Sequence, residues 1–310
     1  MAEETQWSAA DGRLIRRIDW PRLDLPAPME PRRGSILFLP GRGDFYEKYL
    51  ETLDGWHRKG WHVTAADWRG QGGSGRLGND PVTGHIDDFA TWVGDLAALW
   101  AQWQAATPGP HVLAGHSMGG HLVLRALAEG RVDPDAAVLC APMLGLQNRI
   151  VPDWLMQLAA RAMTRLGDPR RPAWKWSDQP GEFAAAREYQ LTHDSARYAD
   201  ELFWRTARPA LVMGPGSWGW VERSYASIRK LAAPGRLEAI TQPVLILASD
   251  HDELVSFAAI ARAAQRLPRG ELVRLGAEAR HEILREEDDV RDAALAAIDD
   301  FLDRSAPVAT

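Results

Sequence analysis

The chain has 310 residues, of which 45% are apolar, so it carries enough apolar side chains for a buried core. Of its 42 acidic and 36 basic residues, nine acidic residues and three arginines lie in 282–304, and the remainder is balanced in charge. Because a balanced chain with no basic stripe cannot neutralise many phosphates, nucleic-acid binding is not expected.

The single cysteine and the hydropathy pattern indicate the cellular compartment in which the protein acts. Cys140 lies in an apolar run and has no second cysteine with which to form a disulfide or a metal site. The first residues lack the apolar stretch of a signal peptide, and no window approaches 18 consecutive apolar residues. We therefore expect a cytoplasmic protein with no integral membrane span.

The pattern of short apolar runs predicts an α/β fold. An Asp11-Gly12 pair between two strand-like runs predicts a hairpin, so the sheet begins antiparallel. Apolar runs bounded by turn residues predict buried strands at 35–39, 62–67, 111–117, 136–142, 243–249 and 271–275. A helix is predicted over 85–106, where apolar residues recur at helical spacing. The alternation implies a mostly parallel sheet with helices on both faces and ligands beyond the strand ends.

Residues 146–235 interrupt this alternation, because they contain no convincing strand. We predict a helical cap or lid there, between a first core segment, 1–145, and a second core segment, 236–310. The glycine-rich stretch that contains Trp218 and Trp220 suits a lid and makes these two residues candidates for substrate contact. Buried tryptophans in a helical subdomain more often simply pack. The acidic stretch 282–304 predicts the solvated face of a C-terminal helix.

The strongest motif is AGHSMGG at 114–120, which has Gly115, Ser117 and Gly119 in G-x-S-x-G spacing between a predicted strand and a predicted helix. This context places Ser117 on a tight strand-to-helix turn, where the two glycines avoid collisions with neighbouring backbone. The next amide, that of Met118, begins a helix and has no internal acceptor, so it favours negative charge. Ser117 is therefore the candidate nucleophile, and the Met118 N–H is the candidate for half of an oxyanion hole.

A serine hydroxyl is a poor nucleophile unless a base removes its proton, so a histidine must lie near Ser117. Of the nine histidines, only His281 follows the last predicted strand, which makes it the leading candidate. His116 and His121 are tied to the strand or helix that carries the nucleophile, and we expect them to position or pack.

An orienting carboxylate is also required, and SDHDELV at 249–255 offers two. Asp250 and Asp252 both follow the strand predicted at 243–249, and spacing alone does not choose between them. The other aspartate would then be a turn residue or a helix N-cap.

With these residues identified, the chain resembles the monoacylglycerol lipase and bacterial lysophospholipase group of α/β hydrolases, often labelled serine aminopeptidase-like. The resemblance rests on LPGRGDFYEKY (39–49), DWRGQGGSG (67–75), GHIDDF (84–89) and GHSMGG (115–120). It implies the α/β-hydrolase fold with a helical cap. It also implies that Gly41 forms a turn and that the backbone N–H of Arg42 is the second oxyanion donor. Pro40 departs from the histidine usual in the group, which puts the bracing of that loop in question.

The resemblance further selects Asp252 as the acid, because a G-x-x-D pattern aligned on Ser249 ends there. It implies acyl transfer, in which Ser117 attacks an ester carbonyl and His281 moves the proton, with no metal or organic cofactor. The expected substrate is a lipid-like ester such as a lysophospholipid or a monoacylglycerol. Peptidases, thioesterases and other acyl hydrolases share this fold and remain alternatives. A non-catalytic binding protein is less expected, because the candidate nucleophile and base are both present.

Overall fold

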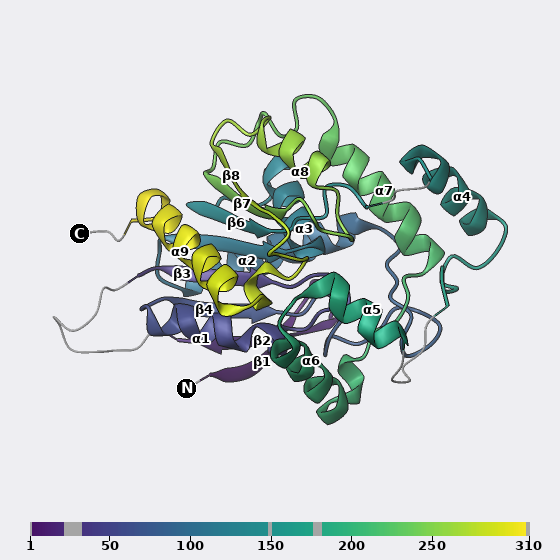
Figure 1. Ribbon diagram of the computed structural model, residues 1–310, viewed down its shortest axis with the longest axis horizontal. Helices are drawn as coiled ribbons and strands as arrows, with labels where there is room; N and C mark the ends of the chain where they lie inside the picture. The colour runs from purple at the N-terminus through teal and green to yellow at the C-terminus, as the bar shows by residue number, and fades with distance from the viewer. Residues whose placement is uncertain (1, 22–32, 148–150, 176–181, 308–310) are drawn as a thin grey trace.

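The computed structural model describes residues 2–21, 33–147, 151–175 and 182–307. The described residues form an eight-stranded sheet in the order β1-β2-β4-β3-β5-β6-β7-β8, with helices around it (Figure 1). The strands are β1 (Glu3–Ser8), β2 (Leu14–Trp20), β3 (Ser35–Leu39), β4 (His62–Ala66), β5 (His111–His116), β6 (Ala136–Cys140), β7 (Val244–Ser249) and β8 (Gly270–Leu275).

The sheet begins with the antiparallel hairpin that the sequence predicts. β1 pairs with β2 so that Trp7 lies opposite Ile15, and Gly12 in the turn has a φ of 81°, a conformation that glycine adopts without strain. β2 is also antiparallel to β4, whereas all later neighbours from β4 to β8 are parallel. The prediction of a mostly parallel sheet that starts antiparallel is therefore confirmed.

Helices lie on both faces of the sheet, and Figure 1 shows α1 and α9 in front of it with α2 and α3 behind. The α-helices are α1 (Leu50–Arg58), α2 (Phe89–Ala106), α3 (Met118–Ala128), α4 (Asp153–Arg165), α5 (Glu182–Leu191), α6 (Ser195–Ala207), α7 (Trp218–Ala232), α8 (Phe257–Ala264) and α9 (Asp288–Ser305). Three 3-10 turns are η1 (Tyr46–Tyr49), η2 (Pro209–Leu211) and η3 (Ile283–Arg285). Strand residues such as Leu37, Val112 and Ile246 are fully buried between these layers.

One helix begins later than the sequence pattern predicts. The hydrophobic spacing predicts a helix over 85–106, but α2 begins at Phe89. The helix begins there because the side chain of Asp88 accepts a hydrogen bond from the N–H of Ala90. An aspartate in this position satisfies one of the free N–H groups of the first helical turn. Ile86 is buried all the same, in the loop before the helix.

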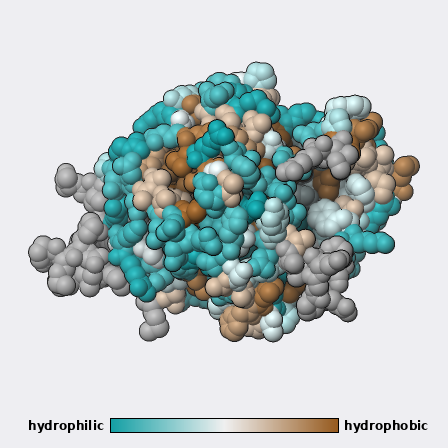
Figure 2. Space-filling model, in the orientation of Figure 1, coloured by the Kyte–Doolittle hydropathy of each residue, from teal (hydrophilic) through white to brown (hydrophobic). Residues whose placement is uncertain are grey.

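The described part of residues 146–235 is helical and contains α4, α5, α6, η2 and α7. The extended contacts of this described part are single bridges, which join Leu146 to Val255, Gly84 to Gly216 and Pro172 to Ser217. α7 packs against α2 and α3 as well as α4. Exposed apolar side chains gather on α4 and α6 (Figure 2), and among them are Trp154, Leu155, Leu158, Leu202 and Phe203. Within the described ranges, no helix combines the length and the apolar character needed to cross a membrane.

Candidate active site

Ser117 lies between β5 and α3, at the carboxyl end of a central strand. Its φ of 51° and ψ of −114° are unusual for a residue with a side chain, and such strain is concentrated at functional sites. The turn is held from both sides, because the Ser117 N–H donates to the Cys140 carbonyl (2.9 Å) and the Ser117 carbonyl accepts from the Met143 N–H (3.0 Å). These bonds hold Ser117 at the carboxyl ends of the parallel strands, where ligands of such sheets bind.

The two motif glycines are explained by close backbone approach. A Cβ on Gly115 would lie 2.8 Å from backbone atoms of Gly119 and Gly120. A Cβ on Gly119 would lie 2.2 Å from the Leu39 carbonyl oxygen and 2.5 Å from that of Pro40. The segment after β3 therefore packs directly on the first turn of α3.

This contact predicts that Gly119→Ala destabilises the fold by about 1–3 kcal/mol, because the added methyl group collides with backbone that cannot rotate away. The measurement is the free energy of unfolding in urea, together with the ester hydrolysis rate. Gly94→Ala is the matched control, since a Cβ there meets nothing within 4 Å and the substitution favours the helix. Equal stability of the two variants would contradict the close approach.

The loop after β3 also reaches Ser117. A Cβ on Gly41 would lie 3.1 Å from the Ser117 Cβ, so only glycine fits this contact. The next residue is Arg42, whose N–H has no backbone acceptor among the described residues. Met118 is the first residue of α3, so its N–H has no acceptor within the helix either. Within the described part of the chain, the N–H groups of Arg42 and Met118 therefore lack a backbone acceptor, and they belong to the residues that follow Gly41 and Ser117.

The loop that contains Pro40 is held in place without the histidine that is usual at this position in the monoacylglycerol lipase and lysophospholipase group. The carbonyl of Pro40 accepts a hydrogen bond from Trp68 Nε1 (2.8 Å). The N–H of Gly41 donates to Asp44 Oδ2 (3.2 Å). The loop conformation therefore depends on a tryptophan and a carboxylate supplied by this chain.

The structure brings His281 and Asp252 together. His281 Nδ1 lies 2.7 Å from Asp252 Oδ2, and both side chains are buried. Asp252 Oδ1 accepts from the N–H groups of Leu254 (2.7 Å) and Val255 (2.9 Å). Burial of the Asp252 carboxyl opposes its ionisation, but His281 and these N–H groups outweigh burial and hold its pKa below the usual value.

His281 itself is poised for proton transfer. Burial opposes its protonation, but the charge of Asp252 and the hydrogen bond to it outweigh that effect and raise the pKa of His281. The His281 backbone lies against His116, the residue before Ser117, because His116 Nε2 donates to the His281 carbonyl (3.2 Å). The two imidazole centroids are 4.8 Å apart. The base candidate therefore lies against His116, the residue that precedes Ser117 in the chain.

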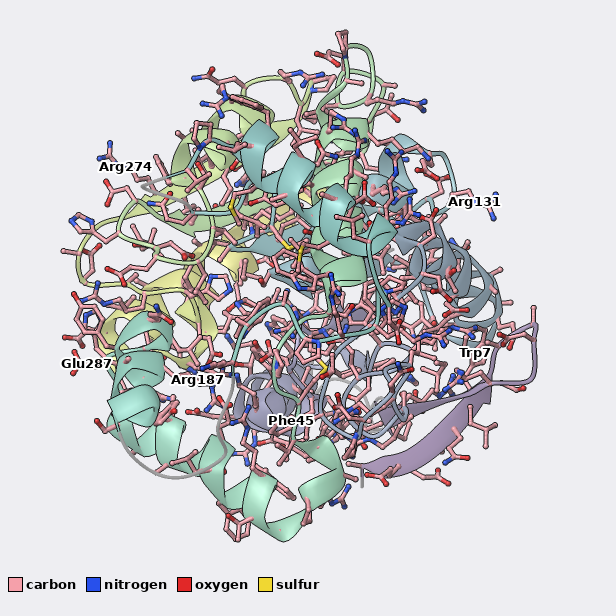
Figure 3. The ribbon with its side chains drawn as sticks, turned by 90° about the vertical axis from the view of Figure 1, so that its right-hand side faces the viewer. Trp7, Phe45, Arg131, Arg187, Arg274 and Glu287 are labelled. Carbon is pink, nitrogen blue, oxygen red and sulfur yellow. The ribbon has the colours of Figure 1, made fainter. Side chains whose placement is uncertain are left out.

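The alternative candidates make other contacts. The Asp250 carboxylate pairs with His251 Nδ1 (2.5 Å) and with Nε of Arg274 (2.8 Å), and Figure 3 shows Arg274 at the edge of the molecule. His121 Nε2 bonds to Ser227 Oγ (2.6 Å), and burial together with the nearby Arg125 lowers its pKa to about 3. None of these contacts brings Asp250 or His121 into the His281–Asp252 pair.

A buried charge cluster beside the site was not expected from the sequence. Lys48 Nζ lies 2.8 Å from Asp44, 2.9 Å from Glu201 and 2.5 Å from Glu282. Burial opposes the charge of Lys48, but the three carboxylates keep its pKa above the usual value. Because Glu201 belongs to α6 and Glu282 follows His281, the cluster joins the helical insertion to the loop of the base candidate.

The two candidate tryptophans lie at the start of α7. Trp220 is buried, and the guanidinium carbon of Arg42 lies 4.9 Å from its ring centroid. Trp218 is partly buried, and its N–H donates to the Arg171 carbonyl (3.1 Å). Trp220 therefore contacts Arg42, the residue that follows Gly41 in the loop after β3. Trp218 contacts the helical insertion and the hydrophobic core instead.

Comparison with known proteins shows clear relatives. The model of the family described as serine aminopeptidase, S33, matches residues 30–288. Lysophospholipase L2 of Escherichia coli (strain K12) is 33% identical over 282 residues, which cover 87% of this chain and 80% of that protein. Monoacylglycerol lipase of Mycolicibacterium smegmatis is 24% identical over 237 residues, with 76% of each protein covered. A soluble variant of monoglyceride lipase from Saccharomyces cerevisiae shares the fold, with a TM-score of 0.77, 19% identity and coverage of 99% and 96%.

Proposed function

The chain belongs to the serine aminopeptidase S33 family of α/β hydrolases, and from this premise we propose that it hydrolyses the acyl ester of single-chain lipids, namely lysophospholipids or monoacylglycerols. One observation carries the proposal: the hydrogen-bonded His281–Asp252 pair packs against His116, the residue directly before Ser117 and its strained turn. These are the three groups that nucleophilic acyl transfer requires.

The proposed reaction follows from the roles that these atoms can take. Ser117 Oγ attacks the ester carbonyl carbon while His281 accepts the hydroxyl proton, and Asp252 holds the imidazole through Nδ1. The N–H groups of Arg42 and Met118 stabilise the oxyanion as it forms. His281 then donates its proton to the leaving alcohol, and water cleaves the acyl-enzyme by the same sequence of proton transfers.

We also propose that residues 146–235 act as a cap over this site. Two contacts support this role. Glu201 of α6 lies 2.9 Å from Lys48 of the core, and Arg42 Nη2 donates to the Gly214 carbonyl (2.8 Å). The exposed apolar side chains of α4 and α6 suit a protein whose substrates gather in micelles or membranes.

An aminopeptidase is the competing function, because the family description names one. Binding the ammonium group of a peptide requires an uncompensated carboxylate near the nucleophile. Asp44, Glu201 and Glu282 are all paired with Lys48, and Arg42 adds a cation to the loop after β3. This charge distribution favours a neutral or anionic substrate. The unpaired Cys140 supports a reducing compartment, and we propose that the protein acts in the cytoplasm.

A substrate panel tests the proposal. We expect kcat/KM for a lysophospholipid or a monoacylglycerol to exceed that for an acyl-coenzyme A thioester and for aminoacyl p-nitroanilides of matched concentration. Ser117→Ala reports any contaminating activity. Faster turnover of the anilides than of both lipids would make the protein a peptidase and refute the proposal.

A further inference from the structure

Arg42 carries a guanidinium that the proposed chemistry does not use. Its carbon lies 5.1 Å from the ring centroid of Trp174 and 4.9 Å from that of Trp220, so it contacts two indole rings. Nη2 donates to the Gly214 carbonyl (2.8 Å). Nε is buried and finds no hydrogen-bond partner in the structure. The side chain is therefore held in one place while part of its donor capacity is unused.

Among the residues that the structure describes, no carboxylate pairs with this cation. Within the described ranges, Arg42 forms no salt bridge. The carboxylate whose charge favours protonated Arg42 is that of Asp44, and it is already paired with Lys48 (2.8 Å). Burial and the repulsion of Arg187 lower the pKa of Arg42 to about 9, so it stays protonated at neutral pH. Arg42 is partly buried, and charges that are withdrawn from water are normally paired, because an unpaired one costs solvation free energy. An incoming anion would compensate this cation.

We propose that Arg42 binds the phosphate of a lysophospholipid and so makes phosphate-bearing monoacyl esters better substrates than neutral ones. The inference rests on the proposed ester hydrolysis at Ser117. Guanidinium groups match the geometry of phosphate oxygens and form strong charge-assisted hydrogen bonds with them.

The position of the phosphate relative to the ester supports this assignment. In a 1-acyl lysophospholipid, the number of covalent bonds between the carbonyl carbon and phosphorus equals the number between the backbone nitrogen and the guanidinium carbon of an arginine. An ester whose oxyanion accepts from the Arg42 N–H can therefore extend its phosphate over the same span as the Arg42 side chain. One residue then contacts both ends of the glycerol unit.

The test compares two substrates of equal acyl length below their critical micelle concentrations, a lysophosphatidylcholine and a monoacylglycerol. Arg42→Gln keeps the backbone N–H and removes the charge. We expect the ratio of kcat/KM for the lysophospholipid to that for the monoacylglycerol to fall by about tenfold to a hundredfold, mainly through KM, as for a lost charged hydrogen bond. Arg42→Lys restores part of the ratio, because it restores the charge.

Arg131→Gln is the matched control. This exposed arginine follows α3. Figure 3 shows it at the edge of the molecule away from Arg187, the residue whose charge acts on Arg42, so its loss leaves the ratio unchanged. An unchanged ratio in a folded Arg42→Gln enzyme would overturn the phosphate assignment while ester hydrolysis stands. Absence of Ser117-dependent hydrolysis of any ester would instead refute the proposed function.

A binding measurement makes the phosphate assignment independent of turnover. Calorimetric titration of the lysophosphatidylcholine into Ser117→Ala and into Ser117→Ala with Arg42→Gln compares affinities in proteins that lack the nucleophile. We expect the second protein to bind at least tenfold more weakly, as for the loss of one charged hydrogen bond. Equal affinities would overturn the assignment.

Discussion

Ser117→Ala is expected to abolish ester hydrolysis, with a loss of about 10⁶ in kcat, as when a triad nucleophile is removed from a serine protease. The hydroxyl oxygen is the atom that forms the acyl-enzyme, and no neighbouring group replaces it. The substitution keeps the Cβ, so the backbone at a φ of 51° carries no new strain and the fold is retained. The measurements are kcat on the best ester of the panel and the far-UV circular dichroism spectrum.

Ser8→Ala is the control for this experiment, because Ser8 is an exposed residue of β1. It should hydrolyse esters at the wild-type rate. Turnover near that rate by pure, folded Ser117→Ala would exclude Ser117 as the nucleophile, and with it the acyl-enzyme mechanism.

Asp252→Asn is expected to lower kcat by about 10⁴, the cost of losing the orienting acid in a serine protease. The amide cannot stabilise the imidazolium that forms when His281 takes the proton, and it favours the wrong tautomer. Asp250→Asn is the matched control, two residues away. It breaks the surface pairs with Arg274 and His251 and leaves the 2.7 Å contact between His281 and Asp252 intact. If Asp250→Asn proved the more damaged of the two folded variants, Asp250 would be the acid.

The same pair predicts the pH profile. His281 acts as a base only when deprotonated, and Asp252 raises its pKa above the ordinary histidine value. In the wild type, kcat/KM should therefore rise with pH through a midpoint above about 6.5. In Asp252→Asn, burial of His281 is no longer opposed by the aspartate, so the midpoint should move to lower pH. The profile of residual activity is measured for both proteins, and equal midpoints would contradict the coupling.

The sequence predicted the parts of the fold that local patterns encode. The hairpin follows from Asp11-Gly12, because its turn requires a residue that tolerates positive φ. The parallel strands follow from short, fully buried apolar runs such as that of β5. The start of α2 was displaced because hydrophobic spacing continues through Ile86, whereas the helix begins where Asp88 caps it. Capping chemistry set this boundary more precisely than periodicity.

The charged surroundings of the site could not be predicted in the same way. Lys48 and Glu201 are far apart in the sequence, and each is an ordinary charged residue until the fold buries both. The placement of Arg42 against Trp174 and Trp220 likewise depends on segments that only tertiary structure brings together. The choice between Asp250 and Asp252 depends on side-chain directions within one loop, which spacing alone does not specify.

The central claim is that Ser117 is an activated nucleophile, and covalent labelling tests it most directly. The protein is treated with a fluorophosphonate, and its intact mass, the labelled peptide and the residual ester hydrolysis are measured together. The account predicts one phosphonyl group per chain, on the peptide that contains Ser117, with activity lost in proportion to labelling and no adduct on Ser117→Ala. An adduct on another residue that tracks the loss of activity, or full activity in protein labelled at Ser117, would contradict it.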